Sequence, residues 1–142
     1  MPDQSLIVTP EVLQRLSALR SQSKFGEEDL YPGAPTEEVR LNAERAVNTM
    51  LYRLAIGLPE SPRKSYVLSE FLEMLKAFEH EDTEEREQAC TYCERVMGIL
   101  GIATSDGALN TWLYGFDPER KPNPRPGVDA GWRVLFAWVR HE

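Results

Sequence analysis

The sequence is poor in the residue types that most often bind metals or act as nucleophiles. It has 2 histidines and 2 cysteines in 142 residues. Cys90-Thr91-Tyr92-Cys93 has no second cysteine pair to complete a zinc site, and His80, Glu81 and Asp82 lack the His-x-x-x-His or Glu-x-x-His spacing of a metal site. We expect no metal, no cofactor and no disulfide, and we expect both cysteines to be small apolar core residues.

Long apolar runs and an excess of basic charge are also missing. No uninterrupted apolar run approaches the roughly 18 residues of a membrane span, and residues 1–10 lack the pattern of a signal peptide. The formal net charge is -7. A negative protein is poorly suited to bind nucleic acid or an anionic membrane surface. These absences predict a soluble cytoplasmic protein that binds neither.

What the chain does contain is apolar residues repeating at helical spacing. The repeats predict an all-α, single-domain bundle of four long helices plus one or two short ones. The four long segments lie between Thr9 and Ser21, Thr36 and Gly57, Ser61 and His80, and Asp82 and Gly101. A short helix is expected over residues 108–114, with Ser105 as its cap and Gly115 at its end.

Helix boundaries follow from local signals. Thr9-Pro10 and Ser61-Pro62 each place a capping hydroxyl before a proline at the first helical position. Asp82 and Glu85 have the spacing of a capping box. Gly57 and Gly101 are expected left-handed stops.

The remaining segments read as connections. Residues 1–8 are expected to be flexible, and residues 25–35 form a loop that Leu30 and Tyr31 pin to the body. Prolines at 122, 124 and 126 predict an extended connector over residues 118–127. It leads to an aromatic segment, 132–139, whose composition suits either a helix or a strand. We favour a helix, because no other strong strand is present to pair with it.

One cluster of polar and aromatic residues could form a small ligand site. Its members are Ser105, Asp106, Asn110, Trp112, Tyr114 and Asp117. The alternative is that these residues serve caps, turns and packing. No nucleophilic triad is evident there, because neither histidine is near in sequence.

Two further patterns suggest protein contacts. The acidic residues Glu81, Glu84, Glu85 and Glu87 could attract a basic partner, or form a solvated helix start. Trp132, Phe136 and Trp138 could anchor a homodimer or belong to the core. The leading hypothesis is a non-enzymatic, inhibitor- or adaptor-like protein-binding domain. The alternatives are a small-molecule-binding module or small enzyme centred on residues 105–117, and a structural homodimer.

The stretch from Asp82 to Pro118 resembles a bacterial domain family of unknown function. The residues that carry the resemblance are Asp82, Thr83, Glu84, Arg86, Tyr92, Glu94, Met97, Ser105, Asp106, Gly107, Leu109, Asn110, Trp112, Tyr114, Gly115, Phe116, Asp117 and Pro118. The similarity extends back to about residue 36. It implies a small helical bacterial protein, and it implies no reaction or cofactor.

Overall fold

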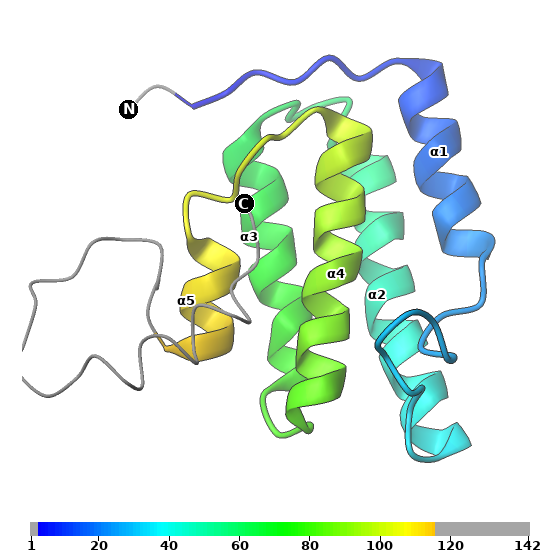
Figure 1. Ribbon diagram of the computed structural model, residues 1–142. Helices are drawn as coiled ribbons and strands as arrows, with labels where there is room; N and C mark the ends of the chain where they lie inside the picture. Colours follow the sequence, from blue (N-terminus) through cyan, green and yellow to red (C-terminus); the bar gives the residue numbers. More distant parts are fainter. Residues whose placement is uncertain (1–2, 116–142) are drawn as a thin grey trace, which may run out of the picture. The chain divides into compact units, whose positions relative to one another are not determined.

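A computed structural model describes residues 3–115, which are almost entirely helical (Figure 1). The elements are α1 (Pro10–Ser21), α2 (Glu37–Gly57), α3 (Lys64–Leu75), the 3₁₀ turn η1 (Lys76–Phe78), α4 (Thr83–Leu100) and α5 (Ala108–Tyr114). Only isolated bridges, and no strands, occur within these residues. The all-α prediction is therefore confirmed, although α1 and α3 have only 12 residues each.

The chain divides into two compact units, Met1–Ile102 and Ala103–Glu142, and each is described by itself. The single-domain organisation stays a prediction. Residues 116–142 lie outside the described part, and so do the predicted connector, Asp117 and the aromatic residues Trp132, Phe136 and Trp138. Among residues 3–115, no helix combines the length and apolarity needed to cross a bilayer.

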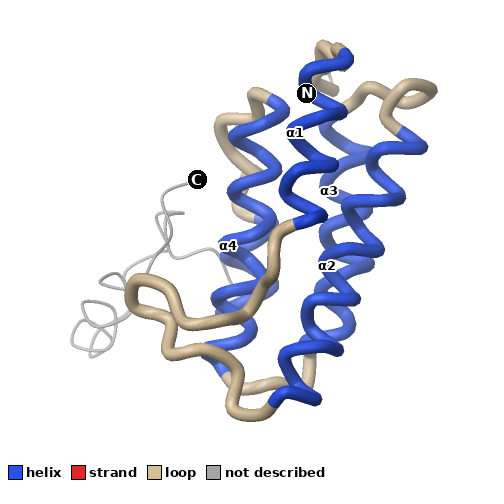
Figure 2. Tube along the Cα trace, turned by 90° about the vertical axis from the view of Figure 1, so that its right-hand side faces the viewer, coloured by secondary structure: helices blue, strands red, loops and turns tan. Residues whose placement is uncertain are grey.

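In the first unit, α1 to α4 pack around one core. The helix α2 contacts α1, α3 and α4, and the two views show it running alongside α3 (Figures 1 and 2). The core residues that are at most 1% exposed include Leu16, Val47, Leu51, Leu54, Phe71, Leu75, Cys90, Cys93 and Val96. The prediction that both cysteines are core residues is confirmed.

Several predicted helix boundaries are correct. The Thr9 and Thr36 hydroxyls each accept a hydrogen bond of 3.1 Å from the backbone N–H three residues later. Gly101 ends α4 with φ 74, a left-handed conformation that glycine adopts without a steric penalty.

The predicted cap at Ser61-Pro62 is wrong. Helix α3 begins at Lys64, and no side chain caps it. Instead the chain's first described residues pair with this connection: Leu6 N–H donates to Pro62 O (2.7 Å), and Lys64 N–H donates to Gln4 O (2.9 Å). A segment within the region expected to be flexible is thus fixed by backbone hydrogen bonds.

The predicted left-handed stop at Gly57 is also wrong. Gly57 is the last residue of α2, with Leu58 as the C-cap in the right-handed region. A Cβ at Gly57 would lie 1.9 Å from the Tyr66 hydroxyl oxygen. The glycine is needed for close approach of the Tyr66 side chain, a tertiary requirement with no local sequence signal.

Candidate functional site

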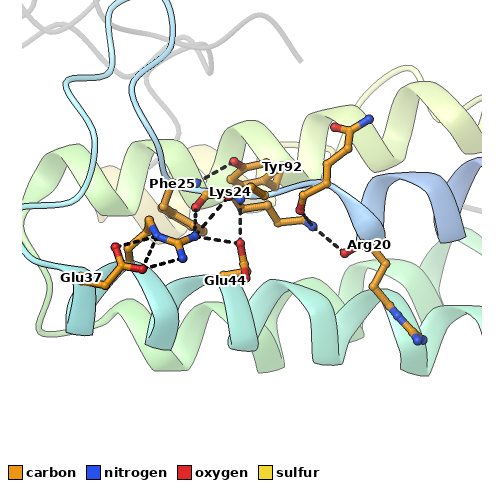
Figure 3. Close-up of polar contacts among 9 residues, drawn as sticks. Arg20, Lys24, Phe25, Glu37, Glu44 and Tyr92 are labelled. Carbon is orange, nitrogen blue, oxygen red and sulfur yellow. Dashed lines mark hydrogen bonds and ion pairs between the residues drawn. The ribbon is translucent and has the colours of Figure 1, made fainter.

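The loop of residues 22–36 lies at the end of the first unit where α2 and α4 begin (Figures 1 and 2), and Phe25 anchors it (Figure 3). The Phe25 ring is fully buried and stacks on Phe78, with ring centroids 5.6 Å apart. Its backbone N–H donates to the Tyr92 hydroxyl at 3.0 Å. Phe25 has φ 63, an uncommon conformation for a bulky residue, so the surrounding contacts must hold it there.

Lys24 fixes the loop to the end of α1. Its backbone N–H donates to Glu44 Oε2 (2.8 Å), and its Nζ donates to the carbonyl oxygens of Arg20 (3.1 Å) and Gln22 (2.7 Å), as Figure 3 shows. Lys24 is only 1% exposed, and burial lowers the pKa of its ammonium group. Because Nζ binds the last carbonyls of α1, this buried lysine has a structural role.

Tyr31 joins the loop to α4 through a buried carboxylate. Its hydroxyl donates to Glu85 Oε2 at 2.9 Å, and Glu85 is 1% exposed. Burial raises the pKa of Glu85, and burial together with the Glu85 carboxylate raises the pKa of Tyr31. Asp82 precedes α4 without a side-chain cap, so the predicted capping box is wrong. Glu85 faces inward and is not exposed to a partner.

Glu28 supplies a third connection between the loop and α4. It accepts hydrogen bonds from Gln88 Nε2 (2.7 Å) and from the Arg95 guanidinium. Burial alone would raise the pKa of Glu28, but the bonds from Arg95 and Gln88 outweigh it, and the pKa is lowered. The face of α4 that holds the loop is thus formed at helical spacing by Glu85, Gln88, Tyr92 and Arg95.

These contacts present a tight turn to solvent. Glu28 N–H donates to Tyr31 O (3.1 Å), and Tyr31 N–H donates to Glu28 O (2.7 Å), which leaves Asp29 and Leu30 at the tip. Leu30 is 98% exposed. The expectation that Leu30 pins the loop is therefore wrong, and Tyr31 has that role.

Exposed carboxylates are frequent in the segments at the same end of the unit as this turn. The turn lies beside the start of α4, and the start of α2 and the η1–α4 connection lie at this end too (Figure 1). The exposed Glu37, at the start of α2, pairs with Arg40 at 2.7 Å. We call the other exposed carboxylates here the acidic end: Glu27, Asp29, Glu38, Glu79, Glu81, Asp82 and Glu84. No salt bridge within residues 3–115 joins any of them to a basic side chain. Of the predicted partner-binding residues, Glu81 and Glu84 belong to it, whereas Glu87 is half-buried.

A groove of about 490 Å³ lies between α2 and α3. Its lining residues are Asn42, Arg45, Ala46, Thr49, Met50, Arg53, Glu70, Glu73, Met74 and Ala77. The Arg53 guanidinium bridges the two walls by an ion pair with Glu70 (2.7 Å). This volume falls within the roughly 300–1,000 Å³ of typical ligand sites. The groove could not be predicted from the sequence, because no local pattern shows which helix faces will border one another.

The predicted ligand cluster lies in the second unit, and some of its members have structural roles. Ser105 is buried, and its hydroxyl accepts a hydrogen bond from Leu109 N–H (3.3 Å) near the start of α5. Asp106 is exposed with φ 57 in the preceding turn. Trp112 and Tyr114 are half-buried. Asn110 differs from these, since it is fully buried and its amide nitrogen and oxygen have no hydrogen-bond partner among residues 3–115.

Residues 3–115 contain no group of three or more histidine, cysteine or acidic side chains placed to hold a metal ion. His80, Glu81 and Asp82 are all exposed around the η1–α4 connection.

Residues 8–117 match a family described as a domain of unknown function, DUF4844, and the chain belongs to this family. The predicted resemblance to a family of unknown function is confirmed. The structure is similar to the crystal structure of a DUF3571 family protein from Acinetobacter baumannii AYE, with a TM-score of 0.67 and 27% sequence identity. The similarity covers 74% of this chain and 89% of that chain. No curated protein matches the sequence.

Proposed function

We propose that this DUF4844 protein is a non-enzymatic, inhibitor- or adaptor-like binding domain that captures a basic protein at its acidic end. The observation that carries the proposal is the gathering of exposed carboxylates around the Asp29-Leu30 turn. Such a charge pattern accelerates encounter with a basic partner and selects against acidic ones. Leu30, at the tip of the turn, adds an exposed apolar contact.

The opposite end of the unit has a different charge balance. There the exposed acidic residues are Asp3, Glu11 and Glu60, and the basic residues Arg63 and Lys64 lie at the same end, in the α2–α3 connection and at the start of α3 (Figure 1). The negative charge is therefore concentrated at one end, which orients an approaching basic protein before contact.

The buried titratable groups that attach the loop to the unit favour binding over catalysis. Lys24, Tyr31 and Glu85 are each bonded to neighbouring protein groups. None of them lines the groove between α2 and α3. A general acid or base must reach its substrate within hydrogen-bond distance, and these three side chains serve the attachment of the loop instead.

A matched pair of charge reversals tests the proposal. Glu81→Lys/Glu84→Lys changes the acidic end, and Glu11→Lys/Glu60→Lys makes the same net change at the opposite end. In each pair one residue lies in the first turn of a helix and one in a connection. Affinity capture with mass spectrometry should recover a basic protein with the wild type and the control, and lose it with Glu81→Lys/Glu84→Lys.

Two outcomes would contradict the proposal. One is unchanged capture by Glu81→Lys/Glu84→Lys, and the other is equal loss with both pairs. The association rate of the recovered partner should also fall steeply between low and physiological salt, since exposed charges are screened over about 8 Å at 0.15 M. An association rate that does not respond to salt would count against electrostatic capture.

A second candidate function is small-molecule binding by the second unit. The observation that favours it is Asn110, whose buried amide has unpaired donor and acceptor atoms. If a ligand binds there, native mass spectrometry of the gently purified protein should detect a bound small molecule that is lost in Asn110→Leu. If Asn110 has no ligand, Asn110→Leu should raise the melting temperature, because it removes an unpaired buried amide without removing a contact.

A further inference from the structure

The groove between α2 and α3 has an apolar floor. Met50 and Met74 line it, and both are almost fully buried, so they lie beneath its surface. Ala46 and Ala77 also line it, and their small side chains leave room for another backbone to approach. Methionine adapts its shape to varied apolar partners, which suits a floor that receives a side chain from another molecule.

The walls of the groove carry charges that are not equally paired. On α3, Glu70 pairs with Arg53, and Glu73 pairs with Lys76 at 2.9 Å. On α2, Arg45 is exposed, and no salt bridge within residues 3–115 involves it. The groove therefore offers an apolar floor beside one cation that a carboxylate could pair with.

We infer that this groove is a docking site for an amphipathic helix of another protein. Its apolar stripe would lie on Met50 and Met74, and a carboxylate beside that stripe would pair with Arg45. The groove follows α2 from Asn42 to Arg53, which is roughly 17 Å at the rise of an α-helix. A helix laid along two neighbouring helices is a recurrent recognition mode. This inference does not depend on the acidic end.

A designed helical peptide provides the probe. We suggest a fluorescent, lactam-stapled peptide of about 14 residues, long enough to span the groove. It has a leucine stripe flanked by glutamates and lysines, and zero net charge. One control peptide replaces the leucines with serines, and a second replaces the glutamates with glutamines and removes as many lysines, so that it also stays neutral. Affinities are measured by fluorescence anisotropy, and the site is mapped by amide chemical shifts.

Three variants test the position and the charge. Ala77→Trp fills the groove from an exposed position and should weaken binding of the leucine peptide at least about tenfold. Arg45→Glu should weaken the glutamate peptide severalfold and leave the glutamine peptide unchanged, a coupling that reports the direct pair. Arg15→Glu, an exposed arginine of α1, should change neither affinity.

Several outcomes would overturn the inference. These are no measurable binding, equal affinity for the leucine and serine peptides, and wild-type affinity of a folded Ala77→Trp variant. A wild-type dimer that Ala77→Trp dissociates would assign the groove to a second copy of this chain instead. The neutral peptide should bind Glu81→Lys/Glu84→Lys as it binds the wild type. Failure here and failure of the proposed capture of a basic protein are thus distinguishable.

Discussion

The two ends of the first unit are closed in different ways. At one end, Leu6 and Lys64 donate backbone hydrogen bonds of 2.7 and 2.9 Å to Pro62 and Gln4, and the exposed Asp3 carboxylate adds hydrogen bonds from Ser65. At the other end, side chains hold the loop of residues 22–36, through Phe25 in the core and through bonds to one face of α4. Backbone pairing makes few demands on sequence, because almost every residue carries the same groups. Side-chain attachment needs particular partners.

This difference has a consequence for function. The loop turns Lys24, Phe25, Glu28 and Tyr31 inward, and its exposed residues include Glu27, Asp29 and Leu30. Attachment by side chains therefore fixes the position of the residues that face solvent. For the proposed basic partner, such an ordered surface would reduce the conformational entropy lost on binding.

Among the substitutions at the end that holds the loop of residues 22–36, Phe25→Ala should be the most destabilising. The substitution removes a fully buried ring that contacts Tyr31, Phe78 and Tyr92. We expect the free energy of unfolding in urea to fall by about 3–5 kcal/mol, as for other buried phenylalanines. Leu30→Ala, at the exposed tip of the same loop, should stay within about 0.5 kcal/mol of the wild type. Similar losses of stability in both variants would contradict the conclusion that Phe25 holds the loop and Leu30 does not.

Tyr31→Phe should have the next largest effect. It keeps the buried ring but removes the hydroxyl that donates to Glu85, and it leaves a buried carboxylate without that donor. An unsatisfied buried polar group costs about 1–3 kcal/mol, which should appear as a lower urea midpoint. Tyr52→Phe is the matched control, because the Tyr52 side chain is 53% exposed and its ring lies under the Arg20 guanidinium. A stable Tyr31→Phe protein would show that the hydroxyl is not an anchor.

Elements with local signals could be predicted from the sequence. Thr9, Thr36 and Gly101 mark helix ends by interactions within one turn of the chain, so their residue types alone indicate the boundaries. Likewise, the helical spacing of apolar residues in α4 is enough to predict that Cys90 and Cys93 are buried.

Positions decided by distant partners could not be predicted. Glu85 has the spacing of a capping residue, but Tyr31, 54 positions earlier, draws it inward. Ser61 precedes a proline as a cap would, but the chain's first residues pair with this connection. The same limit applies to the candidate site. Glu81 and Glu84 were found from their charge, whereas Leu30 and the groove between α2 and α3 depend on how separate segments meet.

Gly57→Ala tests the opposite end of the unit, and its expected effect on stability is smaller. The new Cβ would meet the Tyr66 ring, whose hydroxyl donates to Arg53 O (3.0 Å). We expect a loss of about 1–2 kcal/mol in unfolding free energy, as for overpacking elsewhere. In a Tyr66→Ala background the same substitution should stabilise the helix by about 0.5–1 kcal/mol, because alanine restricts the unfolded chain. Equal effects in both backgrounds would mean that Tyr66 is not the reason for the glycine.

The smallest expected effects are changes in the pH dependence of stability when Glu85 or Glu28 is replaced. Burial raises the folded-state pKa of Glu85, so above that pKa its charge opposes folding, and Glu85→Gln should raise the urea midpoint at neutral pH. This gain should decrease as the pH falls below the raised folded-state pKa, and it should disappear below the ordinary carboxyl pKa, where the wild-type carboxyl is neutral in both the folded and the unfolded chain.

Glu28 should behave in the opposite way. Hydrogen bonds from Arg95 and Gln88 outweigh burial and lower its pKa, so its charge stabilises the fold above its ordinary pKa. Glu28→Gln should therefore lower the midpoint at neutral pH. That loss should disappear as the pH falls through the lowered folded-state pKa, at a more acidic pH than for Glu85. If both substitutions shift stability in the same direction at neutral pH, then the charges of Glu85 and Glu28 do not have the opposite effects on folding that burial and pairing predict. The loop would then be held by its apolar contacts alone.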